Sequence, residues 1–385
     1  MNARSLKGNS PGEINIALET CMAEGFSPTL AVVFISVKQD RNAVCELLTR
    51  HGIDVFGSTS SGEFTDGHES TGEIALLLLD IRKSNYCVLL ESFDGKTDEE
   101  AAATLAKKAL RKFSKPAFIL CSSFFSVDGK VVNGEVLVRS IESVVGPQVN
   151  LFGGMAGDDL SFTGSWVFTN DQASDYGMVA LVLNEDKIDL QGMAISGWKP
   201  LGVFMTVTKS EKNLIYTIDD KPALEMYLRY LGEERAGSDE QFDFFKTVGG
   251  HYPFQIEREG RQALMCTPIG YDKEKEALVC EADVPQGSRF RFSTPPDFDI
   301  IETVIEKAGE LKSATQAEAE ALLIFSCAGR LSALGPLATQ ENDGLADVWN
   351  VPMAGFFTYG EFGRAVNGKH EFHSTTCSWV ALKEK

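Results

Sequence analysis

The sequence contains an internal repeat, and this repeat restricts the possible folds more than any other feature. Three segments each open with a short apolar run that is typical of a buried strand, at residues 30–36, 117–123 and 321–327. A helical pattern follows, most clearly at residues 42–50 and 135–145. Each copy continues with a second short strand that ends in glycine and closes with another apolar run, at residues 74–79, 178–183 and 378–382. The order strand, helix, strand, glycine-acid turn, strand therefore occurs three times.

Short apolar strands that alternate with helical stretches predict an α/β fold, in which helices cover mixed sheets. An additional block separates the second and third copies. We expect it to contain a strand pair at 190–196 and 204–209, further strands at 213–219 and 288–292, and a loop at 232–250. A helix should begin after Asp220, because Pro222 suits a first turn and the acids at 219–220 can cap it. We place a domain boundary inside 187–200 and divide the chain into residues 1–195 and 196–385.

The glycine turns of the first and third copies have identical spacing. Residues 57–64 and 355–362 both read G-x4-G-E-F, and the middle copy, 153–158, is one residue shorter and has Asp in place of Glu. A phosphate-binding loop is excluded, since an acid stands where that motif has lysine and would repel phosphate. The spacing also differs from the dinucleotide-binding G-x-G-x-x-G.

Two interpretations of these turns stay open. The glycines can simply permit tight turns with positive φ, and the acids can be solvated or locally hydrogen-bonded. Alternatively, the three turns converge on one pocket. Its ligand-binding residues would then be the acids Glu63, Asp158 and Glu361 and the hydroxyls of Ser58, Thr59 and Ser60.

Composition excludes several classes of partner. The chain of 385 residues carries 36 basic against 55 acidic residues, a net charge of −19, and has no basic cluster. General binding to nucleic acid or to anionic membranes needs such clusters. The eight cysteines are scattered singly, which favours buried, reduced thiols. Without a signal-like N-terminus or an apolar run of roughly 20 residues, we expect a cytoplasmic protein.

Read together, several segments resemble the FIST family of sensory proteins. The segments are 56–63 (FGSTSSGE), 153–158 (GGMAGD), 196–202 (SGWKPLG), 219–227 (DDKPALEMY), 326–330 (SCAGR), 360–363 (GEFG) and 372–376 (FHSTT). The resemblance spans nearly the whole chain and implies an N-terminal and a C-terminal FIST region. It also implies signal input rather than catalysis: a small ligand would be bound, and a histidine kinase or a cyclic-di-GMP enzyme would be regulated in trans.

One stand-alone branch that the chain resembles binds haem and senses nitric oxide. Haem requires an apolar pocket and an axial ligand, commonly histidine. His251 is our first candidate for the metal ligand, because it lies between two glycines and an aromatic segment, and His373 is the second. Arg330 would clamp a haem propionate or another carboxylate, or would instead form an ion pair with a neighbouring turn acid.

Two other functions stay open. A FIST sensor of an amino acid or a related small metabolite would use Arg330 and the polar loop at 58–63. An α/β enzyme would use Cys327 or Ser58 as nucleophile, but the sequence shows no accompanying base. We therefore expect no catalysis.

Overall fold

The apolar runs of the sequence form the central strands of three sheets in the computed structural model, which describes residues 1–233, 243–259, 263–365 and 368–385. The first repeat contains β1 (Asn2–Gly8), α1 (Pro11–Ala23), β2 (Leu30–Ile35), α2 (Arg41–Arg50), β3 (Asp54–Thr59), β4 (Glu63–Thr65), β5 (His68–Ser70) and β6 (Ile74–Asp80). The second contains β7 (Tyr86–Ser92), α3 (Asp98–Lys112), β8 (Pro116–Ser122), α4 (Gly134–Val145), β9 (Leu151–Met155), β10 (Val167–Phe168), β11 (Ala173–Ser174) and β12 (Gly177–Asn184). The third contains β13 (Ile188–Ile195), α6 (Asp299–Thr315), β22 (Ala321–Cys327), α7 (Ala328–Leu334), α8 (Ala338–Trp349), β23 (Met353–Thr358), β24 (Glu361–Arg364), β25 (His370–His373) and β26 (Cys377–Glu384).

The three repeats share one strand order. Their sheets begin β1-β6-β2-β3, β7-β12-β8-β9 and β13-β26-β22-β23. In each sheet the last two of these strands are parallel, and one or two helices connect them. The predicted threefold repeat and the α/β class are therefore confirmed.

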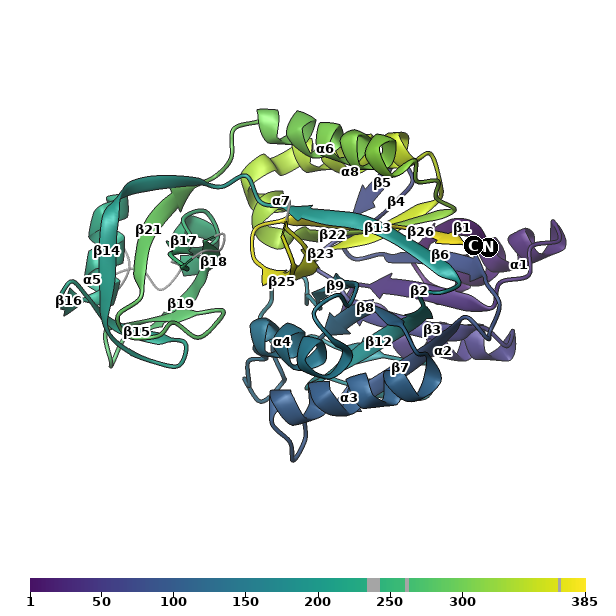
Figure 1. The fold of residues 1–385 in the computed structure, drawn as a ribbon, viewed down its shortest axis with the longest axis horizontal. Helices are drawn as coiled ribbons and strands as arrows, with labels where there is room; N and C mark the ends of the chain where they lie inside the picture. The colour runs from purple at the N-terminus through teal and green to yellow at the C-terminus, as the bar shows by residue number, and fades with distance from the viewer. Residues whose placement is uncertain (234–242, 260–262, 366–367) are drawn as a thin grey trace.

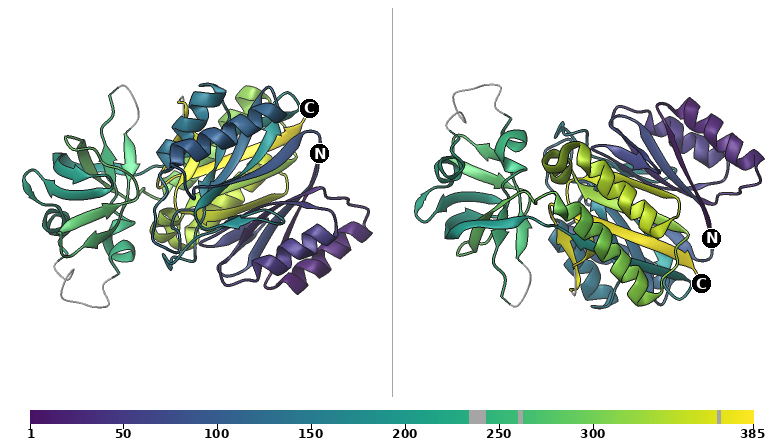
Figure 2. Two further views of the ribbon diagram at one scale, coloured as in Figure 1. Left: turned by 90° about the horizontal axis from the view of Figure 1, so that it is seen from below. Right: turned by 90° about the horizontal axis from the view of Figure 1, so that it is seen from above.

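The sheets surround a common interior, and the helices lie outside (Figures 1 and 2). Alternation along β2 explains this arrangement, since successive side chains of a strand point to opposite faces. Leu30, Val32 and Phe34 belong to a central cluster that all three sheets share. Ala31, Val33 and Ile35 belong to a second cluster with α1 and α2. Helices cover the outer face of each sheet in the same way: α3 and α4 on the second, α6 and α8 on the third.

Each repeat contributes a short hairpin that pairs with the sheet of another repeat. The hairpin β4–β5 of the first repeat pairs with β23 of the third, and β10–β11 of the second pairs with β3 of the first. The hairpin β24–β25 of the third repeat pairs with β9 of the second, which closes a ring of exchanges. We call this ring the three-repeat core (residues 1–195 and 299–385).

The exchanged hairpins explain the repeated glycines. In the three sheets a glycine lies opposite a phenylalanine of the incoming hairpin, as the pairs Gly57–Phe168, Gly153–Phe362 and Gly355–Phe64. A Cβ atom at Gly57 would lie 2.1 Å from the Phe168 ring, and one at Gly355 would lie 2.1 Å from the Phe64 ring. Close approach of an aromatic ring therefore requires glycine at these two positions.

The additional block forms a separate body, which we call the insert (residues 199–294; Figure 1). It contains β14 (Lys199–Glu211), β15 (Leu214–Ile218), β16 (Lys221–Pro222), α5 (Ala223–Leu231), a π-helical turn η1 (Phe245–Gly249), β17 (Phe254–Ile256), β18 (Leu264–Cys266), β19 (Pro268–Asp272), β20 (Ala277–Cys280) and β21 (Arg289–Thr294). Its strands join in one sheet, and its apolar side chains form a cluster of their own.

Two expectations about this block were wrong, and a third concerns residues that the structure describes only in part. The strands predicted at 190–196 and 204–209 do not pair: β13 pairs with β26 of the core, and β14 pairs with β15 and β21 of the insert. The acids at 219–220 do not cap α5, since Asp219 accepts a hydrogen bond from Thr206 N instead. Residues 243–250 of the predicted loop contain η1, and 234–242 lie outside the described residues. The division at 195/196 stays a prediction.

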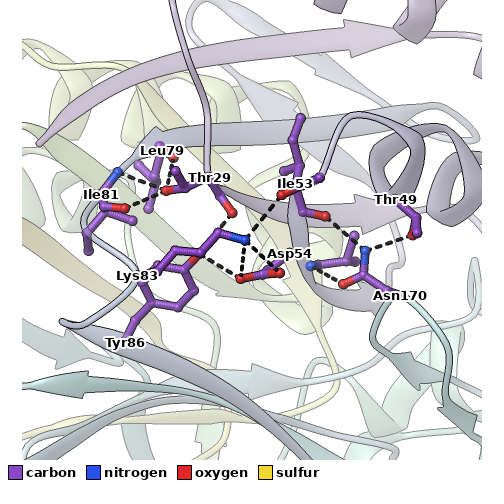
Figure 3. Close-up of polar contacts among 11 residues, drawn as sticks. Thr29, Thr49, Ile53, Asp54, Leu79, Ile81, Lys83, Tyr86 and Asn170 are labelled. Carbon is purple, nitrogen blue, oxygen red and sulfur yellow. Dashed lines mark hydrogen bonds and ion pairs between the residues drawn. The ribbon is translucent and has the colours of Figure 1, made fainter.

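A polar network links the first repeat to the second (Figure 3). Tyr86 of β7 donates to Asp54 Oδ2 at 2.8 Å and to Thr29 O at 2.9 Å. Asn170, in the turn after β10, accepts from Val55 N at 2.8 Å and donates to Ile53 O at 2.9 Å. The bonds of Asn170 satisfy backbone groups at the start of β3, where the turn of the incoming hairpin lies, and the bond to Thr29 O satisfies a carbonyl just before β2.

All eight cysteines are free thiols, and seven of them are buried. In the part of the chain that the structure describes, no helix is long and apolar enough to cross a membrane.

Candidate functional site

The acids of the first and third turns close their own hairpins. Glu63 accepts hydrogen bonds from Ser60 Oγ, three residues earlier, and from Glu73 N at 3.1 Å. Glu361 repeats this pattern with Thr358 Oγ1 at 2.5 Å and Thr376 N at 3.0 Å. Burial raises the pKa of each carboxyl to about 7, and the hydroxyl and backbone donors oppose that rise. The two acids therefore hold the turn against the strand that follows.

The middle acid organises a longer loop. Asp158 accepts from the backbone N–H groups of Phe162, Thr163 and Gly164 at 3.1, 2.6 and 3.0 Å. It also accepts from the Tyr359 hydroxyl of the third repeat at 2.5 Å. Burial raises the pKa of this carboxyl, but its four donors outweigh burial and leave the pKa below its usual range. Asp158 is thus a buried anion that shapes residues 158–164.

The three predicted hydroxyls also lie in the interior. Ser58 Oγ donates to Thr59 O at 3.0 Å, Thr59 Oγ1 donates to Gly157 O at 2.6 Å, and Ser60 binds Glu63. The turns of the first and second repeats do meet here, because Gly157 N donates to Thr59 O at 3.0 Å. The structure thus brings these residues together through mutual contacts.

A cleft lies where the insert meets the core, and we call it the junction cleft. The space in it that water-sized molecules can occupy is about 20 Å³, so the cleft is narrow in this structure. The core contributes Phe124, Phe162, Cys327, Ala328, Gly329, Thr358, Tyr359 and Thr375, and the insert contributes Phe245, Gly250, Thr267, Ile269 and Glu281. Its position follows from the topology, since residues 327–329 leave the carboxyl end of β22, where α/β proteins commonly bind ligands.

Aromatic rings connect the two bodies at this cleft. The Phe162 ring stacks on Tyr359 with a centroid distance of 5.2 Å, and it lies edge-on to Phe245 of the insert, also at 5.2 Å. Phe162 has φ 52°, which is a strained conformation for a bulky residue. The hydrogen bond from its backbone N–H to Asp158 holds Phe162 in this conformation. The residue with the strained backbone is thus the one whose ring contacts both bodies.

Glu281 is a site residue that the sequence analysis missed. Its Oε1 accepts from Thr267 N at 2.8 Å, and it is 5% exposed. Burial and the nearby Glu361 raise the pKa of Glu281 to about 8. Burial together with Glu361 and Glu281 raises the pKa of the Cys327 thiol well above its usual range. No motif surrounds residue 281, so only its position in space identifies it.

The segment 374–376 contacts both Glu361 of the core and Thr267 of the insert. Ser374 Oγ lies 2.9 Å from Thr267 Oγ1 of the insert, and Thr376 Oγ1 donates to Glu361 at 2.7 Å. Between them Thr375 has φ 62°, an outlier for a β-branched residue. Ser374 therefore binds the insert and Thr376 binds the core acid Glu361, on either side of a residue with a strained backbone.

Arg330 is fully buried and bound to groups of the protein. Its Nη2 and Nε form a bidentate ion pair with Glu341 of α8, the Nε bond being 3.1 Å, and its Nη1 donates to Ser196 O at 2.5 Å. This arrangement matches the ion-pair interpretation, although the acid lies on a helix rather than in a turn. The guanidinium joins α7 and α8 to the end of β13, where the chain leaves for the insert.

The two candidate haem ligands lie on different segments and have different partners. His251 follows Gly250 of the cleft wall, and its carbonyl accepts from Trp198 Nε1 at 3.2 Å. His373 lies on β25, with Nε2 3.1 Å from Gly363 O, and burial lowers its pKa. Among the described residues, no group of three or more His, Cys, Asp or Glu side chains is arranged to hold a metal ion.

Comparison with known proteins yields two domain matches and one relative. Residues 29–221 match the FIST N domain, and residues 223–364 match the FIST C domain. An uncharacterized protein of Methanocaldococcus jannaschii is 26% identical over 208 residues, which cover 50% of this chain. The chain spans only 38% of the length of that relative.

Proposed function

The chain belongs to the FIST family of sensory domains that bind small ligands, and we propose that its own ligand binds in the junction cleft. The observation that carries this proposal is that the core and the insert each supply part of the cleft wall. A ligand held there contacts both bodies at once. It therefore favours the arrangement of the two bodies that fits it best, and a sensor needs this difference in affinity.

The chemistry of the wall favours a small, mostly apolar ligand with a hydrogen-bonding group. Phe124, Phe162 and Ile269 supply apolar surface. With a pKa of about 8, the Glu281 carboxyl is largely protonated at neutral pH and can donate a hydrogen bond. Of the two ligand classes considered from the sequence, a small metabolite without a carboxylate suits this wall better than an amino acid. Arg330 is already paired with Glu341 and cannot bind a ligand carboxylate as well.

A thermal-shift screen tests the proposal. A metabolite collection that includes the amino acids is added to the full chain, and each compound that stabilises it is tested again on two variants. Phe162→Ala removes an aromatic wall of the cleft, and Phe298→Ala removes a ring that is 63% exposed and serves as the matched control. At a hundredfold excess over Kd a ligand contributes about 2.7 kcal/mol of stability.

We expect Phe162→Ala to lose most of the ligand-dependent stabilisation and Phe298→Ala to keep it. Stabilisation of equal size in the wild type and in both variants would show that the ligand binds elsewhere. The partner that receives the signal, a histidine kinase or a cyclic-di-GMP enzyme acting in trans, stays a proposal. Its test is the activity of the candidate enzyme with and without the ligand-bound chain.

Haem with nitric oxide is the more specific proposal, and one observation favours it. His251 lies next to Gly250, which lines the aromatic cleft. The described residues fit haem only in part, since His251 does not itself line the cleft and Arg330 has no free donor pair for a propionate. Haem added to the purified chain should give a Soret band that survives gel filtration and is altered by His251→Ala. A chain that stays colourless excludes this proposal.

We propose no catalytic role for Cys327 or Ser58. A cysteine nucleophile acts as thiolate, and the pKa of the Cys327 thiol is raised well above its usual range by burial and two acids. The Ser58 hydroxyl is buried and donates to the backbone carbonyl of Thr59.

A further inference from the structure

A second cleft lies in the first repeat, at the place that corresponds to the junction cleft in the third. Residues 36–42 leave the carboxyl end of β2 as residues 327–329 leave that of β22, and Thr59 at the end of β3 corresponds to Thr358 at the end of β23. No described residue of the insert lines this second cleft. The space in it that water-sized molecules can occupy is about 520 Å³, much more than in the junction cleft.

Arg41 is the cation among the described lining residues of this cleft, and it forms no ion pair there. The Arg41 guanidinium lies 4.6 Å from the centre of the Trp166 ring and 5.6 Å from that of Phe168. Within the described ranges no side-chain hydrogen bond or ion pair of Arg41 is formed, and burial lowers its pKa. These cation–π contacts do not use the guanidinium N–H groups, which have no hydrogen-bond partner among the described residues and can therefore bind an anion.

The rest of the lining is apolar or neutral, with one exception. Val127 is 61% exposed and Val37 is 36% exposed, so both present apolar surface in the cleft that holds the Arg41–Trp166 cation–π pair. The exception is Asp40, whose Oδ1 already accepts from Ala43 N at 3.0 Å as the N-cap of α2. Exposed aliphatic side chains next to a half-buried cation suit a ligand with an apolar body and an anionic end.

We propose that this second cleft binds a small carboxylate with an apolar body, through a bidentate contact to Arg41. The carboxylate would accept two parallel hydrogen bonds from the guanidinium edge. Its apolar part would contact Val37, Val127 and the rim of Trp166. The site is separate from the junction cleft, so its existence does not depend on the function proposed above.

The two clefts share one structural element. The loop shaped by Asp158 supplies Phe162 to the junction cleft and Thr163, Gly164 and Trp166 to the second cleft. An occupant of the second cleft thus contacts the same loop that carries a wall of the first.

Isothermal titration of the full chain with benzoate, benzamide and benzylamine tests the site. The three probes share a ring and differ in charge. Arg41→Gln keeps much of the side-chain length without the charge, and Arg50→Gln, exposed at the end of the same helix, is the matched control. Hydrogen bonds to a charged group predict that Arg41→Gln weakens benzoate binding by about tenfold or more. Arg50→Gln should leave it within about twofold, which is the scale of exposed-charge effects.

A second variant keeps the test independent of the folding of Arg41→Gln. Val127→Asp adds a negative charge on an exposed wall and should also weaken benzoate binding. Benzamide and benzylamine should bind more weakly than benzoate to the wild type. The proposal is overturned if benzoate does not bind at millimolar concentration, if benzamide binds equally well, or if Arg41→Gln leaves the affinity unchanged in a folded protein.

Discussion

Replacing Asp158 by Asn tests the role of the buried anion most directly. The carboxylate accepts four hydrogen bonds, three of them from consecutive backbone N–H groups and one from Tyr359. An asparagine has one oxygen, so its amide nitrogen must face either the pair of donors at Thr163 and Gly164 or the pair at Phe162 and Tyr359. Tyr359 can rotate its hydroxyl to accept, but a backbone N–H cannot.

The expected loss follows from the donors left unpaired. Each buried donor without an acceptor costs about 1–3 kcal/mol. Two are left unpaired when the amide nitrogen faces Thr163 and Gly164, and one when it faces Phe162 and Tyr359, so we expect about 1–6 kcal/mol of lost stability. Urea denaturation followed by circular dichroism measures this difference. Asp128→Asn, at an exposed position of another loop, is the matched control and should change the free energy of unfolding by less than about 0.5 kcal/mol.

The pH dependence gives an independent check. The pKa of Asp158 is lowered in the folded protein, so its stabilisation is complete above the ordinary pKa of 3.8 and is lost as the pH falls through the lowered value. The difference between wild type and Asp158→Asn should therefore be constant above about pH 5 and shrink in more acidic solution. A loss below about 1 kcal/mol, or a difference that does not shrink in acid, would refute the interpretation of Asp158 as a buried anion that stabilises the loop.

Three further predictions concern the interior. Glu341→Gln leaves the Arg330 charge buried and should cost about 3–5 kcal/mol in urea denaturation, and a loss below about 1 kcal/mol would contradict a buried ion pair. Gly153→Ala should prevent stable folding, because a Cβ would lie 1.9 Å from Leu120 O, whereas Gly129→Ala, with φ 77° and open space, should cost only about 1 kcal/mol. Glu281 keeps its proton up to about pH 8 when folded but loses it near 4.5 when unfolded, so this group makes the free energy of unfolding fall as pH rises between those values. Glu281→Gln should flatten that fall in a series of thermal melts, and an unchanged slope would argue against a raised pKa.

The repeat could be predicted from the sequence because its strands are buried on both faces. Such strands are continuous apolar runs, and the run at 321–327 is the whole of β22. The exchange of hairpins could not be predicted, since the partners of β4 and β24 lie in other repeats and no local pattern marks them. The expected pairing at 190–209 was wrong for a related reason: strands adjacent in sequence usually pair, but here the chain passes from the core into the insert between them.

The repeated motif predicted which acids are equivalent, but none of the six predicted ligand-binding residues lines the junction cleft. The spacing of Glu63 and Glu361 indicated equivalent acids, and the structure gives them equivalent partners. Their full burial was not visible in the sequence, because an acid after glycine is usual in solvated turns. Glu281 and Arg41 had no motif at all, and tertiary contacts alone give them their surroundings.

The exchanged hairpins also affect how the protein folds. Phe64 of the first repeat packs against Gly355 of the third, so the ring of hairpins cannot close until the chain has been synthesised past residue 355. Until then β4 and β5 present an unpaired edge with an exposed aromatic side chain, which is a risk for aggregation. Contacts so distant in sequence predict slow folding with populated intermediates. We therefore expect the yield of refolded protein to fall steeply with protein concentration.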